Sequence, residues 1–382
     1  MAQKVDIFLA VHKHYSYLKK FVIFGLMLYK PYCIVSAVEW YGVTMPGKVP
    51  PKIMEKIVYR RLGALDPSVL VGPAVGEDAA IIDVGGGLTL VVHNDAISGA
   101  SNLLGWLAVH IVANDVAVRG AKPRWFLMSL FLPEESEEDL LDKIMVQVDE
   151  AARELGVMVV GGHTERTHGI NKPLAGTTMI GLANKNKIVT SSGARDGDYL
   201  LMSKTAAIEG TAILCTDFAD ALRSKGVSDK ILKNGSSLLT KVSVVKEALA
   251  LAEKRLATSM HDPTEGGILG GVAEIAYASR KTIELWPEKV PIAEETKIIA
   301  EALHIDILRL ISSGALIATI PSNKVNEAIK TLHSLNIDAN IIGRVKKCTG
   351  HLIEVIKDSS VTYVDDVYIV DEIFRFWKTL AK

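Results

Sequence analysis

Cysteine is scarce in this sequence. The 382 residues include only three cysteines, Cys33, Cys215 and Cys348, which lie far apart and form no C-x-x-C pair. A disulfide framework needs an even set of cysteines, and a zinc site needs cysteine or histidine ligands at short spacings. The sequence therefore supports neither kind of site, and we expect the protein to work in the reducing environment of the cytoplasm.

A surplus of either charge and a long apolar run are also missing. Lys and Arg total 43 against 44 for Asp and Glu, so no basic excess indicates a nucleic-acid partner. The apolar stretch 21–29 is interrupted by Lys30 and Pro31 and is shorter than the about 20 residues of a membrane-spanning helix. No clear signal-peptide cleavage site follows it. We therefore expect neither a nucleic-acid nor a membrane partner.

The glycine-rich phosphate loop of many nucleotide-binding proteins is absent. The pattern G-x-x-x-x-G-K-[ST] occurs nowhere, and the run Gly85–Gly87 falls between two strand-like segments, where it predicts a hairpin. Any phosphate binding must therefore come from acidic side chains, metal ions and backbone amides.

What is present is material for two globular domains. Apolar residues make up 49% of the chain, and strand-like and helical patterns alternate from Pro50 onward. The turn Gly193–Asp198 separates two halves. We expect a first domain over 45–193 and a second over 194–382, each of α+β or α/β class. We interpret residues 1–44 as an extension without a defined fold, translated from upstream of a start at Met45.

Acidic residues stand at the ends of two neighbouring strands. Glu77 and Asp78 come directly before the strand expected over 79–84, and Asp95 follows the strand expected over 88–93. Carboxylates that meet at strand ends commonly hold Mg²⁺ and polyphosphate. The alternative is that they are ordinary turn acids.

The helix expected over 102–119 carries polar residues on an apolar background. Asn114 and Asp115 are flanked by Val112, Ala113 and Val116. Burying an unpaired carboxylate costs several kcal/mol, so a metal ion, a ligand or a capping partner must compensate. A structural alternative is that Asp115 caps a neighbouring backbone segment.

Two further polar segments follow expected strands. The first is Gly161-Gly162-His163-Thr164-Glu165, after a strand over 157–160 that we expect to be buried. Its glycines would let backbone N–H groups approach phosphate oxygens, and its ionisable side chains could transfer protons. A plain turn is the alternative.

The second segment is His261-Asp262-Pro263-Thr264-Glu265-Gly266-Gly267. Its paired glycines open a helix whose N-terminus can hold an anion. Three ionisable side chains within five residues favour a functional loop over a simple surface turn.

Six segments in order carry a resemblance to a known family: GEDAAIID, NDAISGA, ANDVAVRGA, GGHTER, HDPTEGG and ISSGALIATI. Together they span about Val71 to Pro321, and they resemble the aminoimidazole ribonucleotide (AIR) synthetase-related superfamily. Within it, the similarity is greatest to the hydrogenase expression/formation proteins of the HypE type, in their archaeal-like version.

The resemblance implies an architecture and a site. Members are homodimers whose N-terminal sheets pair into a barrel, and ATP with Mg²⁺ lies between this barrel and a C-terminal α/β domain. The implied metal ligands are Asp78, Asp95, Asp115 and Asp262. The implied nucleotide contacts are Asp78, Asp95, Asn114, Asp115, Gly161, Gly162 and Thr164. His163, His261 and Glu265 are the implied proton-transfer residues.

The implied chemistry is the activation of an amide or thioamide oxygen by ATP-dependent phosphorylation, with hydrogenase maturation as one setting and a maturation protein as one partner. The HypE group carries its substrate on a C-terminal cysteine, whereas this sequence ends in DEIFRFWKTLAK. We therefore expect a different, small-molecule or protein-borne amide as substrate. A thiamine monophosphate kinase-like or AIR synthase-like activity, and a non-catalytic nucleotide-binding role, are the alternatives.

Overall fold

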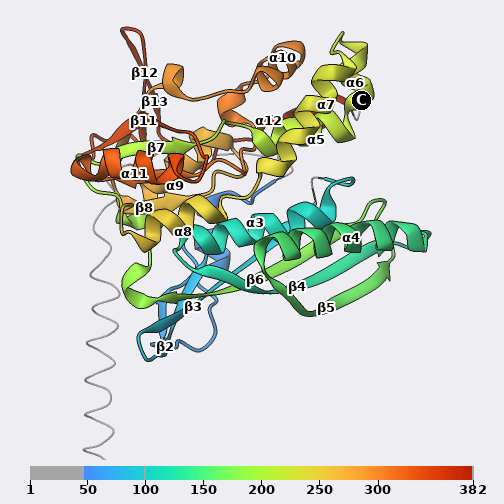
Figure 1. Ribbon diagram of the computed structural model, residues 1–382, viewed down its shortest axis with the longest axis horizontal. Helices are drawn as coiled ribbons and strands as arrows, with labels where there is room; N and C mark the ends of the chain where they lie inside the picture. The colour runs from blue at the N-terminus through green and yellow to red at the C-terminus, as the bar shows by residue number, and fades with distance from the viewer. Residues whose placement is uncertain (1–46, 99, 381–382) are drawn as a thin grey trace, which may run out of the picture.

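The computed structural model describes residues 47–98 and 100–380, which form two β-sheets with associated helices (Figure 1). The six strands of the first sheet run in the order β1-β2-β3-β6-β4-β5, and the seven of the second in the order β13-β12-β9-β11-β7-β10-β8. This mixed architecture confirms the predicted fold class. The prediction for residues 1–44 concerns residues outside the described ranges, and the exact domain boundaries stay predictions.

The first half contains the following elements: α2 (Pro51–Ile53), the π-helical turn η1 (Met54–Val58), β1 (Val69–Val71), β2 (Ala80–Gly85), β3 (Leu88–Ile97), α3 (Leu104–Val118), β4 (Lys122–Pro133), α4 (Glu138–Leu155), β5 (Met158–Thr167) and β6 (Leu174–Asn184). As predicted, β2 and β3 form an antiparallel hairpin across Gly85–Gly87.

The second half contains β7 (Tyr199–Ser203), α5 (Ile208–Asp217), α6 (Ala219–Ser224), α7 (Asp229–Ser237), α8 (Val245–Glu253), β8 (Ser259–His261), α9 (Gly267–Ser279), β9 (Thr282–Leu285), α10 (Glu294–Leu303), β10 (Ile317–Ile320), α11 (Val325–His333), β11 (Ala339–Lys346), β12 (Ile353–Lys357), β13 (Ser360–Val364) and α12 (Glu372–Leu380). Throughout the described residues, no helix is both long and apolar enough to cross a membrane.

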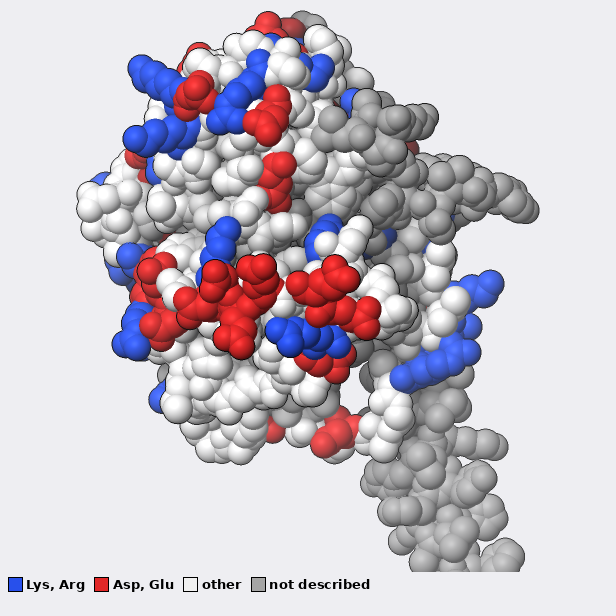
Figure 2. All heavy atoms as spheres, turned by 90° about the vertical axis from the view of Figure 1, so that its right-hand side faces the viewer, with Lys and Arg blue, Asp and Glu red and all other residues white. Residues whose placement is uncertain are grey.

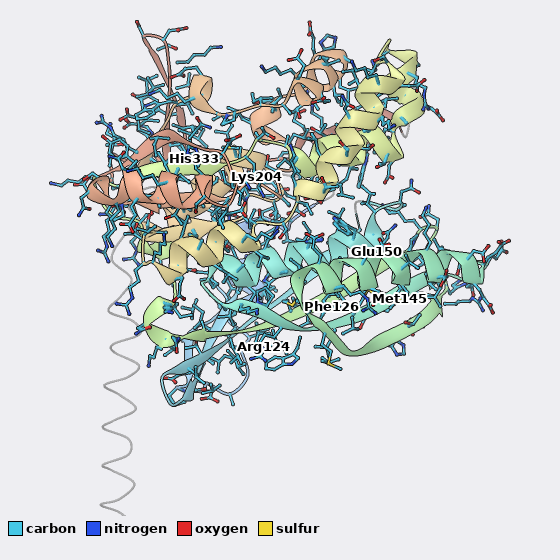
Figure 3. All side chains as sticks on the ribbon, in the orientation of Figure 1. Arg124, Phe126, Met145, Glu150, Lys204 and His333 are labelled. Carbon is cyan, nitrogen blue, oxygen red and sulfur yellow. The ribbon has the colours of Figure 1, made fainter. Side chains whose placement is uncertain are left out.

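Helix α3 lies between the first sheet and α8 of the second half (Figure 1). Because both sides of α3 are covered, it is apolar nearly all round, as expected of a helix inside a core. Phe126 of β4 is fully buried in the layer between the first sheet and its helices (Figure 3). The polar residues of α3 are therefore buried at the junction of the two halves.

The other face of the first sheet is apolar and has none of the described helices against it (Figure 1). Burial alternates along β4 and β6, so one face is buried while its opposite stays partly exposed. The partly exposed face carries Leu90, Val92, Trp125, Leu127, Phe131, Leu174, Ile180 and Leu182. A sheet face of this composition normally packs against another surface.

The expectation that residues 157–160 form a buried strand is wrong. Strand β5 pairs only with β4 and is the edge of the sheet, so its residues are exposed, with Met158 at 67%. The apolar run in the sequence is typical of a buried parallel strand, but the far side of β5 has no neighbouring strand among the described residues.

Charged groups are unevenly placed on the surface. Figure 2 shows Asp and Glu side chains gathered in a band across one side of the molecule, with Lys and Arg scattered among them. On this side, the scattered cations form no continuous basic surface.

Candidate active site

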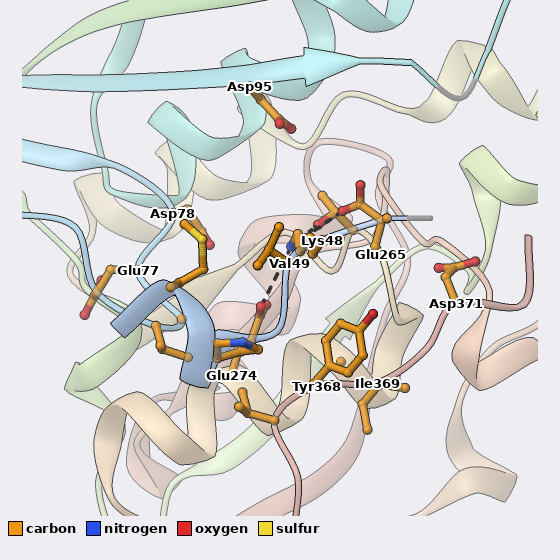
Figure 4. Close-up of a pocket in the computed structure, with 18 of the residues that line it drawn as sticks. Lys48, Val49, Glu77, Asp78, Asp95, Glu265, Glu274, Tyr368, Ile369 and Asp371 are labelled. Carbon is orange, nitrogen blue, oxygen red and sulfur yellow. Dashed lines mark hydrogen bonds and ion pairs between the residues drawn. The ribbon is translucent and has the colours of Figure 1, made fainter. Parts of the chain in front are cut away.

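A cleft of about 340 Å³ is lined by residues from both halves of the chain (Figure 4). The first half contributes the 47–59 segment, the acidic turn before β2, the end of β3 and one residue of α3. The second half contributes the loop before α9, one side chain of α9 and the 367–371 segment. Segments from both ends of the described chain therefore line the same cleft as Asp78 and Asp95, the acids that we predicted at strand ends.

A cluster of ionisable side chains forms the inner part of the cleft. His93, Asp95 and Asp115 each offer one ligand atom, and these atoms all lie within 4.8 Å of one another. The Nε2 atom of His93 is 3.2 Å from Asp115 Oδ2. His93 was missed by the sequence analysis, although the two-residue repeat of a strand places it on the same face of β3 as Asp95.

The acids of this cluster are held where charge is costly. Burial raises the pKa of Asp95, and Glu265 adds to the effect. Burial raises the pKa of Asp115 well above its ordinary value, with further repulsion from Asp78 and Asp95. Among the described residues, neither acid forms a salt bridge with lysine or arginine. A divalent cation fits such a donor set, because it compensates both the burial and the repulsion.

Two buried cations hold the acidic turn before β2. Arg119, which is fully buried, donates to Glu77 Oε2 at 2.8 Å and to Asp78 Oδ2 at 2.6 Å. It also donates to the carbonyl of Met260 in the second half. His261 Nδ1 lies 2.6 Å from the other oxygen of Asp78. Both oxygens of Asp78 are therefore engaged by protein cations, which makes it a weaker metal ligand than Asp95 and Asp115.

His261 is held between two carboxylates. Its Nε2 atom is 2.6 Å from Glu274 Oε2, opposite its contact with Asp78. Burial alone would lower the pKa of His261, but Asp78 and Glu274 raise it to about 10. Despite burial, the pKa of Asp78 is lowered by His261 and Arg119. An imidazolium fixed in this way suits the positioning of Asp78 better than the proton transfer that the sequence suggested.

Two other predicted site residues lie behind the cleft. Asn114 Nδ2 donates to the carbonyl of Val242 and to Asp262 Oδ2, each at 2.9 Å. Asn114 Oδ1 accepts the N–H of Val244 at 2.8 Å. Neither Asn114 nor Asp262 lines the cleft, and both are buried. Their hydrogen bonds instead join α3 to the second half.

The predicted residues Gly161, Gly162, His163 and Thr164 are not brought to this cleft within the chain. They lie on the exposed strand β5, where His163 Nε2 is 3.0 Å from Glu165 Oε2. The sequence analysis placed them after a strand over 157–160, but they lie within β5, which runs from Met158 to Thr167. The sequence also does not show the strand order. Because β6 and β4 separate β3 from β5, the two sets of polar residues occupy different parts of the sheet.

The helix N-terminus predicted as an anion site is already used by the protein. The N–H of Gly266 donates to Asp371 Oδ2 at 2.8 Å. Burial raises the pKa of Asp371 to about 7, against the hydrogen bonds from Ile373 and Gly266. Glu265, the remaining predicted proton-transfer residue, lines the cleft.

Lys48 is a cleft residue that no sequence pattern marked. Its ammonium donates to Thr264 Oγ1 at 3.0 Å and lies 3.5 Å from Glu265 and 3.8 Å from Glu274, as the dashed lines of Figure 4 partly show. Burial alone lowers the pKa of Lys48, but Glu274 and Glu265 raise it above its ordinary value. Lys48 is therefore a cation inside an otherwise acidic cleft.

The rest of the cleft wall is largely apolar. It includes Val49, Met54, Val75, Ile369 and Phe374. An apolar wall beside an acidic, metal-compatible cluster can hold a molecule with a flat ring at one end and a metal-bound polyanion at the other.

Comparisons with known proteins agree with this architecture. Residues 76–183 match the N-terminal domain of AIR synthase related proteins, and residues 195–355 match the C-terminal domain. The chain is 26% identical over 322 residues to a putative hydrogenase expression/formation protein of Methanocaldococcus jannaschii, which covers 81% of this chain and 92% of that protein. It is 31% identical over 248 residues to the hydrogenase expression/formation protein HupE of Azotobacter chroococcum, covering 63% and 69% respectively.

A solved structure shares the fold. The hydrogenase maturation protein HypE in complex with ATP superimposes with a TM-score of 0.63 at 23% identity, over 84% of this chain and 95% of that one.

Replacement of Arg119 by Gln should destabilise the protein strongly. The variant leaves Glu77 and Asp78 without their buried cation, and breaking such a pair typically costs about 3–5 kcal/mol. Urea denaturation would measure the loss in free energy of unfolding. Arg124→Gln is the matched control, because Arg124 is exposed and should change stability by less than about 0.5 kcal/mol. Equal stability of the two variants would show that the buried network is dispensable.

Proposed function

The chain belongs to the AIR synthase related family, and on this basis we propose that it is an ATP-dependent enzyme of the HypE-like type, which activates an amide or thiocarboxamide oxygen by phosphorylation. The observation that carries the proposal is the cleft between the two halves, where an apolar wall adjoins a buried acidic cluster. The names of the relatives favour hydrogenase maturation as the setting and a maturation protein as partner. The cytoplasm is the proposed location.

His93, Asp95 and Asp115 are the residues proposed to hold Mg²⁺. The carboxylates of half-buried Asp95 and buried Asp115 repel each other, and a divalent cation would compensate that repulsion. Magnesium would supply the charge neutralisation that phosphoryl transfer from ATP requires. Asp78 is fixed by Arg119 and His261 and would complete the negative wall of the site.

The remaining polar residues of the cleft have different proposed roles. The Lys48 ammonium places a positive charge near Thr264 and Glu265, where it can attract phosphate oxygens. Glu265 lines the cleft and is the proposed proton acceptor. His261, between two carboxylates, is proposed to position Asp78.

A second copy of the chain is the proposed partner of the apolar sheet face. This face extends across the neighbouring strands β3, β6 and β4 and carries apolar residues on each of them. Two such faces are self-complementary, which suits a twofold dimer. The proposed nucleotide contacts of Gly161, Gly162 and Thr164, and proton transfer by His163, would then require β5 of the partner copy to reach the cleft.

The activity can be tested with purified protein and Mg-ATP. We expect ADP release to rise with carboxamide or thiocarboxamide substrates and to stay at its basal level with thiamine monophosphate or formylglycinamidine ribonucleotide. Release only with thiamine monophosphate or the formylglycinamidine would instead identify the kinase or cyclo-ligase alternative. Tight Mg-ATP binding with no release on any substrate would favour a non-catalytic role.

Replacing Asp95 or Asp115 by Asn should weaken Mg-ATP binding by about tenfold or more, because a charged ligand of the cation is lost. Calorimetry on the folded variants, with and without EDTA, would measure the affinity. Asp83→Asn is the matched control, since Asp83 is also a strand-end acid but pairs with Lys185 outside the cleft. Unchanged Mg-ATP affinity in both test variants would show that Asp95 and Asp115 do not bind the cation and would favour the alternative that they are ordinary turn acids.

Light scattering should give a mass of about twice the 41.4 kDa of one chain. Ile180→Asp puts a charge in the middle of the apolar sheet face and should yield a monomer, because the charge would be buried at the interface. Val361→Asp is the control: Val361 is an exposed apolar residue on the edge strand of the second sheet, and its substitution should leave the dimer intact. A wild-type monomer at micromolar concentration would contradict the proposal.

A further inference from the structure

A small inner cavity of about 50 Å³ adjoins the cleft. The two spaces share Asp95, Thr264, Glu265 and Phe374 as wall residues. The remaining walls of the cavity are mostly apolar and include Ile97, Ile111, Ile213 and Ile311. This volume exceeds what one water molecule needs and suits the end of a small molecule. Three further polar side chains line it: Ser98, which is exposed, and Glu209 and Ser313, which are buried and have no role in the proposed function.

The backbone holds Glu209 and Ser313 side by side. Glu209 lies in the first turn of α5, and its N–H donates to the carbonyl of Ser313 at 3.3 Å. The N–H of Gly210 donates to the carbonyl of Ile311 at 3.1 Å, which ties the same turn to the same loop. A side chain at Gly210 would collide with Leu310, so the two segments are in close contact. The positions of the two polar groups are therefore fixed before any ligand binds.

Both side chains are buried, and each has an oxygen that no other part of the described chain satisfies. Glu209 is 5% exposed and Ser313 is fully buried. Apart from each other, neither Glu209 Oε2 nor Ser313 Oγ has a hydrogen-bond partner among the described residues, and no described lysine or arginine forms a salt bridge with Glu209. Unpartnered polar groups in a protein interior are costly and rare, so such a pair beside a ligand cleft indicates that something else satisfies them.

The charge around the cavity narrows the choice of ligand. Burial raises the pKa of Glu209 to about 8, an effect opposed by the nearby Ser313 hydroxyl and reinforced by Glu265 and Asp262. A carboxylate or phosphate group would be repelled by these acids. A group with N–H donors would be accepted, because a carboxyl oxygen and a hydroxyl oxygen both offer lone pairs in either protonation state of Glu209.

We infer that this cavity binds the –NH₂ end of a small amide- or amidine-type substrate, with Glu209 Oε2 and Ser313 Oγ accepting its N–H groups. The inference rests on the proposed function and specifies its substrate class. With the nitrogen of an amide or thioamide in the cavity, the oxygen or sulfur of the same planar group faces the cleft, where Asp95 and Glu265 form the shared wall. Glu209 and Ser313 thereby orient the substrate and select against compounds without N–H.

Saturation-transfer NMR on the full chain with Mg-ADP would test this with four probes: acetamide, thioacetamide, acetamidine and N,N-dimethylacetamide. The first three carry N–H groups and should bind, whereas dimethylacetamide has none and should not compete. Glu209→Leu should weaken acetamide binding by about tenfold or more, and Ser313→Ala by a smaller factor. Preference for acetamidine over acetamide would identify a cationic substrate within the class.

Glu209→Gln is a second test variant in case Glu209→Leu does not fold. Glutamine keeps the shape of glutamate and one acceptor oxygen, so this variant should retain part of the acetamide binding. Glu247→Gln is the matched control: Glu247 is equally buried in the second half but lies outside the cavity, and its substitution should leave probe binding unchanged. Equal binding of acetamide and dimethylacetamide, no binding of acetamide to the wild type, or unchanged binding in Glu209→Leu would overturn the inference.

Calorimetry with Mg-ATP on the same samples distinguishes failure of the cavity assignment from failure of the proposed function. Normal Mg-ATP binding alongside any of those negative results would remove only the assignment of the inner cavity. Absence of Mg-ATP binding in the wild type would remove the proposed function itself.

Discussion

The fully buried Arg119 is the interaction on which the site most depends. It lies at the end of α3, in the first half, and reaches two acids of the turn before β2 and a backbone carbonyl of the second half. Removing a guanidinium from water is expensive, and the acceptors around its two terminal nitrogens offset much of that cost. The contacts that compensate the charge of Arg119 therefore also hold Glu77 and Asp78 in place. These two acids form part of one wall of the cleft.

The cleft exists only when both halves are in place. Asn114 and His261 use their hydrogen-bonding groups to join the halves, and neither is free to follow a ligand. No described lysine or arginine forms a salt bridge with Asp95, Asp115 or Glu209, and these acids line the cleft and the small cavity beside it. Acids that look alike in the sequence thus differ in whether a lysine or arginine of the protein compensates their charge.

The sequence was most informative where the site is local. The hairpin from β2 to β3 and the acids at its ends were predicted because strand, turn and carboxylate follow one another directly. Lys48 and Tyr368 could not be predicted, since they enter the cleft from opposite ends of the described chain. The segment from Gly161 to Glu165 was grouped with the acids because strand order is a tertiary property that local patterns do not contain. Glu209 was missed because its neighbours on α5 are apolar and no motif surrounds it.

The exposed edge strand β5 has a consequence for how the protein reaches its native state. Among the described residues, β5 has no strand on its far side, so it presents unpaired backbone groups beside the exposed apolar residues Met158, Val159 and Val160. Such an edge can add a strand from any unfolded chain nearby, in competition with correct pairing. Because unfolded chains are most abundant early in refolding, the yield of native protein should fall when the chain is refolded from denaturant at high concentration.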